Sequence, residues 1–285
     1  ALTGDDIVAV AQTGTGKTLA FGLPSVNRLA ATPPDRNRML VLTPTRELCV
    51  QVHNVLDPLA KAIGLRSVCV YGGVGMEPQT KALRKGCDIV IATPGRLLDH
   101  MSRGNVRFEN IEILVLDEAD RMLDMGFLPD IRRILKSMPQ DRQTLLFSAT
   151  MPDEIRKLTR EFMNDPERIE VAPSATPAEA VRQTVYTVDQ ANKAELLARV
   201  LDAPEVYSAI VFIRTKHRTD RIAKQLSKKG FKAQAIHGDR SQAQRQRALD
   251  GFRSGKFNVL VATDVAARGI DVQGISHVVN FDILV

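Results

Sequence analysis

The feature that most constrains this chain is a regular alternation of short apolar runs with longer amphipathic stretches. The short runs are rich in Val, Ile and Leu, which is typical of strands buried on both faces of a parallel sheet. The longer stretches have the length and periodicity of helices. Alternating strands and helices predict an α/β fold with a mostly parallel sheet. In the first part of the chain we expect buried strands at Ile7–Val10, Arg38–Thr43, Ser67–Tyr71, Asp88–Ala92, Ile111–Leu116, Gln143–Phe147 and Ile169–Val171.

A break in this alternation divides the 285 residues into two parts. Residues 172–180 (APSATPAEA) hold two prolines among small residues, a composition typical of a linker. We therefore expect domains at residues 1–172 and 181–285, a linker at 173–180, and a ligand cleft between the domains. After the linker we expect strands at Val181–Val188, Ser208–Ile213, Lys232–Ile236, Asn258–Thr263 and His277–Phe281, and helices near Asn192–Leu201, Lys216–Lys229 and Ser241–Ser254.

The composition excludes several classes of protein. With 44% hydrophobic and 25% charged residues, the chain can bury a core and is not mainly disordered. The apolar runs fall far short of the roughly 18 residues of a membrane-spanning helix, so we expect no membrane partner. Cys49, Cys69 and Cys87 form no CxxC pair, which argues against a disulfide framework or a zinc site. Together with the lack of a visible targeting segment, this predicts a reducing, cytoplasmic location.

The net charge of +6 is unevenly distributed. Residues 1–172 carry 22 Lys and Arg against 22 Asp and Glu, whereas residues 173–285 carry 17 against 11. The excess of positive charge in the second part fits a polyanionic partner, although a basic solvated surface explains it equally well.

A Gly-rich segment, AQTGTGKT, follows the first expected strand and precedes a helical stretch interrupted at Pro24. A strand, a Gly-rich turn and a helix together form the context of a P-loop, in which backbone N–H groups face a polyphosphate. Lys17 would reach the β- and γ-phosphates, and the Thr18 hydroxyl would ligate Mg²⁺. The strict pattern has Gly at the position of Ala11, so one position departs from it. The expected nucleotide-binding residues are Ala11, Gln12, Thr13, Gly14, Thr15, Gly16, Lys17 and Thr18.

Carboxylates and hydroxyls follow two further expected strands. The strand that ends at residue 116 leads into Asp117, Glu118 and Asp120. Asp117 is expected to hold Mg²⁺, partly through water, and Glu118 to orient and deprotonate the attacking water. Acidic residues also favour helix N-termini, but the P-loop shifts the interpretation to phosphoryl transfer. Ser148 and Thr150, after a third strand, are expected to bond to Asp120 or to the water near the γ-phosphate.

These motifs and several others resemble the DEAD-box family of ATP-dependent RNA helicases, the superfamily 2 helicase core, in a bacterial-like form. The further matching sequences, in chain order, are PTREL at 44–48, GG at 72–73, TPGR at 93–96, VFIRT at 211–215, HGD at 237–239, QAQR at 242–245 and VATDVAARGID at 261–271. The resemblance implies two tandem RecA-like domains that use ATP and Mg²⁺ and grip RNA by its backbone, with little sequence preference.

The resemblance also assigns site residues. It implies that Lys17, Asp117, Glu118, Ser148 and Thr150 act in catalysis, and that Asp120, Gly269 and Asp271 contact the nucleotide, Asp271 at the ribose. The residues that it implies for RNA binding are Pro44, Thr45, Arg46, Gly72, Gly73, Thr93, Pro94, Gly95, Arg96, Arg214, Thr215, Gly238, Gln242, Arg245, Thr263 and Asp264.

The expected function is RNA-stimulated ATP hydrolysis coupled to local unwinding of short RNA duplexes. Both ends depart from the family pattern, since a segment with an adenine-reading Gln should precede the P-loop and an arginine-rich motif should follow Asp282. Hydrolysis by the chain is therefore expected to be impaired. A nucleotide-dependent RNA clamp that barely hydrolyses ATP and a P-loop ATPase that acts on DNA stay open as alternatives. Protein partners are not indicated.

Overall fold

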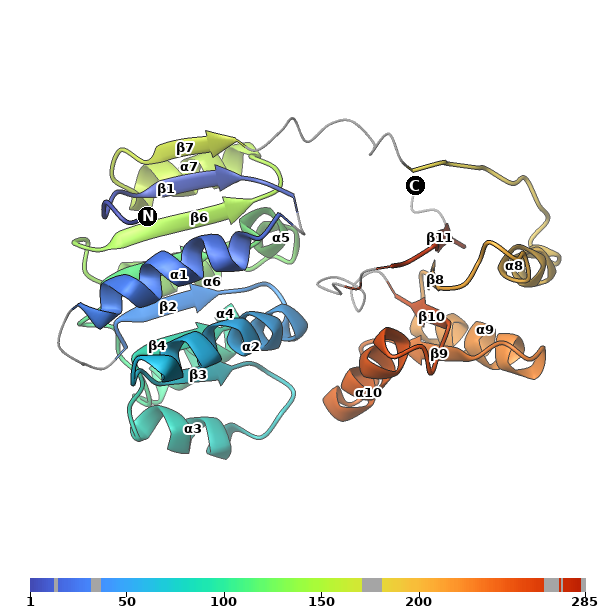
Figure 1. The fold of residues 1–285 in the computed structure, drawn as a ribbon, viewed down its shortest axis with the longest axis horizontal. Coiled ribbons are helices and arrows are strands. Elements are labelled where there is room, and N and C mark those ends of the chain that lie inside the picture. Colours follow the sequence, from blue (N-terminus) through green and yellow to red (C-terminus); the bar gives the residue numbers. More distant parts are fainter. Residues whose placement is uncertain (13–14, 32–36, 171–180, 264–271, 273, 283–285) are drawn as a thin grey trace. The chain divides into compact units, whose positions relative to one another are not determined.

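The computed structural model describes residues 1–12, 15–31, 37–170, 181–263, 272 and 274–282 (Figure 1). The chain divides into two compact units, residues 1–178 and residues 179–285. Each unit contains a parallel β-sheet with helices, which confirms the α/β class predicted from the alternating pattern.

Unit 1 contains a seven-stranded parallel sheet with the order β3-β4-β2-β5-β6-β1-β7. Helices connect successive strands, because a parallel neighbour can be reached only by a crossover. The strands are β1 (Ile7–Val10), β2 (Met39–Leu42), β3 (Ser67–Val70), β4 (Ile89–Ala92), β5 (Ile113–Leu116), β6 (Gln143–Ser148) and β7 (Glu167–Glu170). The helices are α1 (Lys17–Ala30), α2 (Arg46–Ala62), α3 (Met76–Arg84), α4 (Pro94–Ser102), α5 (Ala119–Asp124), α6 (Leu128–Lys136) and α7 (Asp153–Phe162).

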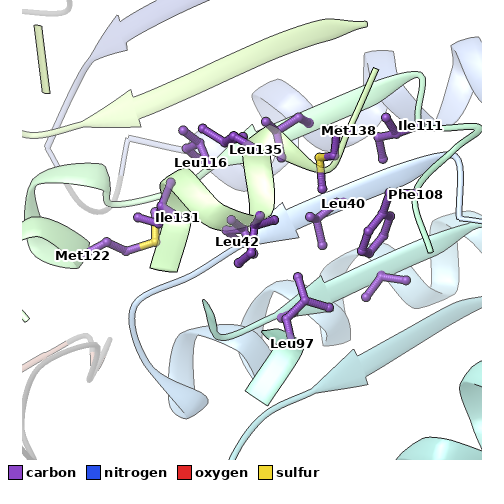
Figure 2. Packing of buried hydrophobic residues seen from close by; sticks show 14 of the residues in the cluster. Leu40, Leu42, Leu97, Phe108, Ile111, Leu116, Met122, Ile131, Leu135 and Met138 are labelled. Atoms are coloured by element: carbon purple, nitrogen blue, oxygen red, sulfur yellow. The ribbon is translucent and has the colours of Figure 1, made fainter. Parts of the chain in front are cut away.

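Two apolar cores cover the opposite faces of this sheet. In β2, Leu40 and Leu42 pack with α4, α5 and α6 on one face, while Met39 and Val41 pack with α1 and α2 on the other. Figure 2 shows the first of these cores, with Phe108 close to Leu40. Successive side chains of a strand point to opposite faces, so a strand that is apolar at every position requires helices on both sides. The result is a three-layered unit whose strand ends are held rigidly.

Unit 2 contains a four-stranded parallel sheet with the order β11-β8-β10-β9. Helices α8 and α9 pack on one face of this sheet, and α10 packs on the other. The elements are α8 (Lys193–Leu201), β8 (Ala209–Phe212), α9 (Lys216–Lys228), β9 (Ala233–Ile236), α10 (Gln242–Arg253), β10 (Val259–Ala262) and β11 (His277–Asn280).

Three local expectations were wrong. Residues 181–188 form no strand, and Val185 is 84% exposed. Their alternation of apolar and polar residues suits a strand, but a strand also needs a neighbouring strand with which it can form hydrogen bonds. The strand expected at Ile169–Val171 is present as β7, but all four of its residues are exposed rather than buried, and it pairs with β1 alone at the sheet edge; Val171 lies outside the described residues. Pro24 does not interrupt α1, since Phe21, Val26 and other buried side chains hold the helix against the sheet.

No helix among the described residues is long and apolar enough to cross a membrane. The three cysteines are free thiols, of which Cys49 and Cys87 are buried and Cys69 is partly exposed. The expected linker, residues 173–180, lies entirely outside the described residues.

Candidate functional site

The predicted site residues of unit 1 that the structure describes gather at the C-terminal ends of the strands, because all seven strands are parallel and end on the same side of the sheet. The strands that precede the nucleotide-binding motifs, β1, β6 and β5, are neighbours, and so are β2, β4 and β3, which precede the motifs expected to bind RNA. The two groups meet between β5 and β2, where the Asp117 N–H donates to the Leu42 carbonyl at 2.9 Å. The sheet thus joins the two sets of motifs directly.

The P-loop segment connects β1 to α1. The Ala11 N–H donates to the Ser148 carbonyl at 3.0 Å, which ties the start of the loop to the end of β6. Gly16 caps α1 with φ of 79°, a left-handed conformation that favours glycine. The Lys17 ammonium donates to the Ala11 carbonyl at 3.1 Å, so it folds back over the loop. The first N–H groups of a helix have no partner within it and attract anions. Thr13 and Gly14 lie outside the described residues.

Asp117 is the most perturbed carboxylate near the loop. Its residue is 2% exposed, and its Oδ1 finds no hydrogen-bond donor among the residues that the structure describes. Burial raises the pKa of Asp117 to about 7, opposed by the positive charge of Lys17 and reinforced by the negative charge of Glu118. A buried carboxylate oxygen without a donor fits a hydrated Mg²⁺, which takes oxygen ligands and keeps several waters.

Glu118 is held in an unusual conformation by a partner that the sequence analysis missed. Its backbone has φ of 53°, in the left-handed region that non-glycine residues rarely adopt. Its Oε2 accepts a hydrogen bond of 2.8 Å from Arg121 Nη1. Such strained residues gather at functional sites. Arg121 follows Glu118 by three residues, a spacing at which side chains meet at the start of a helix, and this spacing could have identified it.

Asp120 joins α5 to the segment after β6. Its Oδ2 accepts from both the Thr150 N–H at 2.8 Å and the Thr150 hydroxyl at 2.9 Å. The Asp120 N–H donates to the Ser148 hydroxyl at 3.1 Å, and this hydroxyl donates to the Thr150 carbonyl at 2.7 Å. Three of these hydrogen bonds join the two segments, and the fourth, from Ser148 to Thr150, fixes the turn after β6.

The segments after β2 and β3 pack against each other. Thr45 caps α2, since its Oγ1 accepts from the Leu48 N–H at 3.2 Å. Pro44, just before it, is buried. The guanidinium of Arg46 lies against Gly72 and Gly73, so closely that a Cβ at Gly73 would collide with it. Gly73 also has φ of 80°, so both its backbone and its surroundings require glycine.

The segment after β4 starts α4, with Thr93 at the cap and Pro94 in the first turn. Both residues are buried. Arg96 donates from Nη1 and Nη2 to the Val74 carbonyl, at 3.1 Å each. Gly95, between Pro94 and Arg96 in the sequence, has no atom within 4 Å of the place where a Cβ would be. The structure therefore brings the RNA motifs expected in the first unit together at one edge.

The expected RNA residues of unit 2 also follow neighbouring parallel strands. Arg214 and Thr215 follow β8, and Thr263 follows β10. Gly238 follows β9, from which His237 separates it. Gln242 and Arg245 lie in the first turn of α10, whose cap, Ser241, forms a capping box with Gln244. Asp264, Gly269 and Asp271 lie outside the described residues.

Two contacts in unit 2 involve residues that the sequence analysis did not identify. Lys216, at the start of α9, donates to Asp239 at 2.6 Å, beside Gly238. The Asp282 carboxylate, two residues after β11, accepts from Arg218 at 2.9 Å and from the Arg214 N–H at 3.3 Å. Partners far apart in sequence give no local pattern, so only the fold could reveal them.

Comparisons with family models give two matches. Residues 1–158 match the model described as DEAD/DEAH box helicase. Residues 192–284 match the model described as helicase conserved C-terminal domain.

Individual proteins resemble the chain along nearly its whole length. It is 46% identical to the ATP-dependent RNA helicase CshA of Listeria monocytogenes, covering 99% of the chain and 54% of that protein. It is also 46% identical to CshA of Geobacillus kaustophilus, covering 60% of that protein. The chain thus spans little more than half the length of these curated relatives.

Among solved structures, S. cerevisiae Dbp5 bound to RNA and ADP BeF3 matches with a TM-score of 0.85 and 31% identity. That match covers 98% of this chain and 71% of Dbp5. A DEAD box protein of Methanococcus jannaschii matches with a TM-score of 0.56 and 40% identity, covering 99% of this chain and 76% of its own.

Proposed function

Because the chain belongs to the DEAD/DEAH box helicase family, we propose that the protein is an ATP-dependent RNA helicase that couples RNA-stimulated ATP hydrolysis to the local separation of short RNA duplexes. The observation that carries this proposal is the strand order of unit 1. It supports the proposal because the three segments expected to bind the nucleotide follow adjacent strands, and the three segments expected to bind RNA follow the strands beside them. Because β5 and β2 are neighbours, ATP that binds after β5 can change the geometry of the RNA segments that follow β2.

For ATP, the chain supplies a phosphate cradle and two carboxylates with different tasks. The P-loop N–H groups and Lys17 bind the phosphates, and Lys17 exchanges its bond to Ala11 for a phosphate oxygen. Thr18 and Asp117 would hold Mg²⁺, which would neutralise charge on the phosphates. Arg121 occupies Oε2 of Glu118 and so leaves Oε1 to accept a proton from the attacking water.

For RNA, the chain supplies helix starts and guanidinium groups. Arg46 and Arg96 lie beside the turns that follow β3, and the helices behind Thr45 and Thr93 begin at the same edge. Such donors suit phosphate oxygens and read no bases. We expect residues 1–172 to act as the ATP-binding domain and residues 181–285, with their excess of positive charge, to add further backbone contacts.

Asp120 joins the segments after β5 and β6, which both belong to the nucleotide group. A phosphate or a water that draws Thr150 away from Asp120 breaks two hydrogen bonds at once, and this disturbs the first turn of α5, whose N-cap is Glu118. Because the N–H of Asp117, just before Glu118, donates to the Leu42 carbonyl of β2, we expect RNA binding and ATP turnover to change together. The free thiols of the chain fit a cytoplasmic protein.

The test is ATP turnover with and without single-stranded RNA. Glu118→Gln should lose at least about 100-fold in turnover, since general bases contribute about 10²–10⁴ in rate. Lys17→Ala should lose a similar factor, because it removes a positive charge that stabilises the transferring phosphate. Lys81→Ala is the matched control, because Lys81 is 77% exposed and pairs with Glu77 of its own helix. RNA-stimulated turnover in Glu118→Gln that equals the wild type would refute the role of Glu118.

Strand displacement distinguishes the alternatives. A helicase separates a short RNA duplex when ATP is added, and its RNA affinity falls steeply with salt because phosphate contacts dominate. RNA binding with turnover at buffer background would favour a clamp instead. Equal stimulation by DNA would favour a DNA-directed ATPase.

A further inference from the structure

Two cysteines that the proposed reaction does not use lie in contact beneath the RNA motifs of unit 1. Cys49 is in the first turn of α2 and Cys69 is in β3, and their Sγ atoms are 3.1 Å apart. A disulfide requires about 2.05 Å between the sulfurs, so the bond needs a shift of only about 1 Å.

The two thiols differ in access to solvent. Cys49 is fully buried, and burial, reinforced by Cys69, raises the pKa of its thiol well above the usual value. Cys69 is partly exposed, because β3 is an edge strand of the sheet. A soluble oxidant therefore reaches Cys69 first, and Cys49 is the second thiol within contact distance.

The pair is linked to all three RNA motifs of this unit. The Cys49 N–H donates to the carbonyl of Thr45 at 3.0 Å, and its Sγ lies 3.3 Å from the carbonyl of Ile91, two residues before Thr93. Cys69 lies three residues before Gly72, in the strand whose next carbonyl, that of Val70, accepts from the Thr93 N–H at 3.0 Å. A shift of either sulfur therefore moves backbone that these motifs share.

We propose that Cys49 and Cys69 form a reversible disulfide when the protein meets hydrogen peroxide, and that this disulfide weakens RNA binding. The second half of this statement rests on the proposed function; the first half does not. Intracellular disulfides are usually transient and serve redox sensing.

The reaction balances with one peroxide molecule. The Cys69 thiolate attacks a peroxide oxygen, the O–O bond breaks, and water leaves with the thiol proton, which gives a sulfenic acid. The Cys49 sulfur then attacks the Cys69 sulfur, its proton leaves with the hydroxyl as a second water, and the S–S bond forms. Two thiols lose two electrons, and the peroxide gains them. A dithiol reductant reverses the change.

The disulfide weakens RNA binding because the segments expected to bind RNA are tightly packed against one another. Arg46 already lies against Gly73 so closely that one added carbon would collide. Drawing the first turn of α2 towards β3 by about 1 Å therefore displaces the guanidinium or the turn. We expect the oxidised protein to bind single-stranded RNA about fivefold to tenfold more weakly, up to ~1.4 kcal/mol.

A peptide map tests the bond. The full chain is treated with peroxide, remaining thiols are alkylated, and trypsin is added without reductant. Cleavage after Arg46, Lys61, Arg66 and Lys81 places the two cysteines in peptides 47–61 and 67–81. We expect these peptides to be joined, with the loss of two hydrogen atoms, while Cys87, in peptide 86–96, is alkylated. Two separate alkylated peptides, or Cys69 oxidised beyond the sulfenic acid, would overturn the proposal.

RNA affinity, measured by fluorescence anisotropy, tests the consequence. The loss should reverse with dithiothreitol and should be absent in Cys69→Ala, whereas Cys87→Ala should respond like the wild type. Cys49→Ala serves as the second variant, and thermal melting shows that each variant folds. A joined peptide with unchanged RNA affinity would overturn the coupling. Should the reduced protein bind no RNA, the proposed function fails while the peptide map still decides whether the disulfide forms.

Discussion

The contact between Arg46 and Gly73 gives the sharpest prediction for mutagenesis. Gly73→Ala adds one carbon where the guanidinium of Arg46 now lies, in a backbone with φ of 80°. Two costs follow, and they are separable. One is the strain of a left-handed alanine, and the other is the displacement of Arg46 from the turn.

The strain costs the folded protein about 1–2 kcal/mol, the penalty of a left-handed conformation for a residue with a Cβ. The displacement costs RNA binding instead. A hydrogen bond from a charged group contributes about 1.5–3 kcal/mol when its partner is present, so losing the Arg46 contact should lower RNA affinity by about 10-fold to 100-fold.

Gly64→Ala is the matched control. Gly64 has φ of 78° but nothing within 4 Å of the place where a Cβ would be. It follows the C-terminal end of α2, whereas Arg46 begins that helix. Thermal melting should show a comparable loss of stability in both variants. Fluorescence anisotropy with single-stranded RNA should show weaker binding only for Gly73→Ala.

A double-mutant cycle makes the reasoning refutable. In an Arg46→Ala background, Gly73→Ala should change RNA affinity by less than about twofold, because the displaced group is already gone. A further tenfold loss in that background, or wild-type affinity of Gly73→Ala alone, would show that Arg46 does not mediate the effect.

Three further predictions concern unit 1. Arg121→Ala should lower ATP turnover about tenfold at saturating ATP with little change in KM, because Glu118 loses the ion pair that orients it; an unchanged maximal rate would contradict this. Burial raises the pKa of Asp117 from 3.8 to about 7 in the folded state. As the pH rises from about 4 towards 7, the unfolded chain therefore loses the Asp117 proton while the folded protein keeps it, and the free energy of unfolding falls by a few kcal/mol in all. Without Mg²⁺, Asp117→Asn should therefore melt at a higher temperature than the wild type at pH 8 and show a smaller gain at pH 5.5; an equal gain at both would refute the burial argument. Phe108→Ala should lower the free energy of unfolding by about 3–5 kcal/mol in urea titrations, because Phe108 is 2% exposed in the core, whereas Leu19→Ala, at a position 48% exposed, should change it by less than about 1 kcal/mol.

The α/β class could be predicted because four strands of unit 1, β1, β2, β4 and β5, are apolar at every position. A run such as Met39–Leu42 is stable only when both of its faces are covered, so the pattern itself requires two layers of helices. The same reasoning failed at residues 181–188 and at β7. There the pattern shows only that a segment can pair, and the availability of a neighbouring strand decides whether it is paired and buried.

The order of the strands could not be predicted from the pattern. Short apolar runs look alike, and nothing in the sequence shows that β6 lies between β5 and β1 or that β2 lies beside β5. This order brings the Asp117 N–H to the Leu42 carbonyl and thereby joins the expected nucleotide and RNA motifs.

The candidate site residues could be predicted from the sequence alone, because a Gly-rich turn, a lysine and paired carboxylates after strands together indicate phosphoryl transfer. What holds those residues was decided by the tertiary structure. Arg121 on Glu118, the buried Asp117 oxygen and the contact of Cys49 with Cys69 each depend on distances between side chains. Packing sets those distances, and residue types and their spacing along the chain do not specify them.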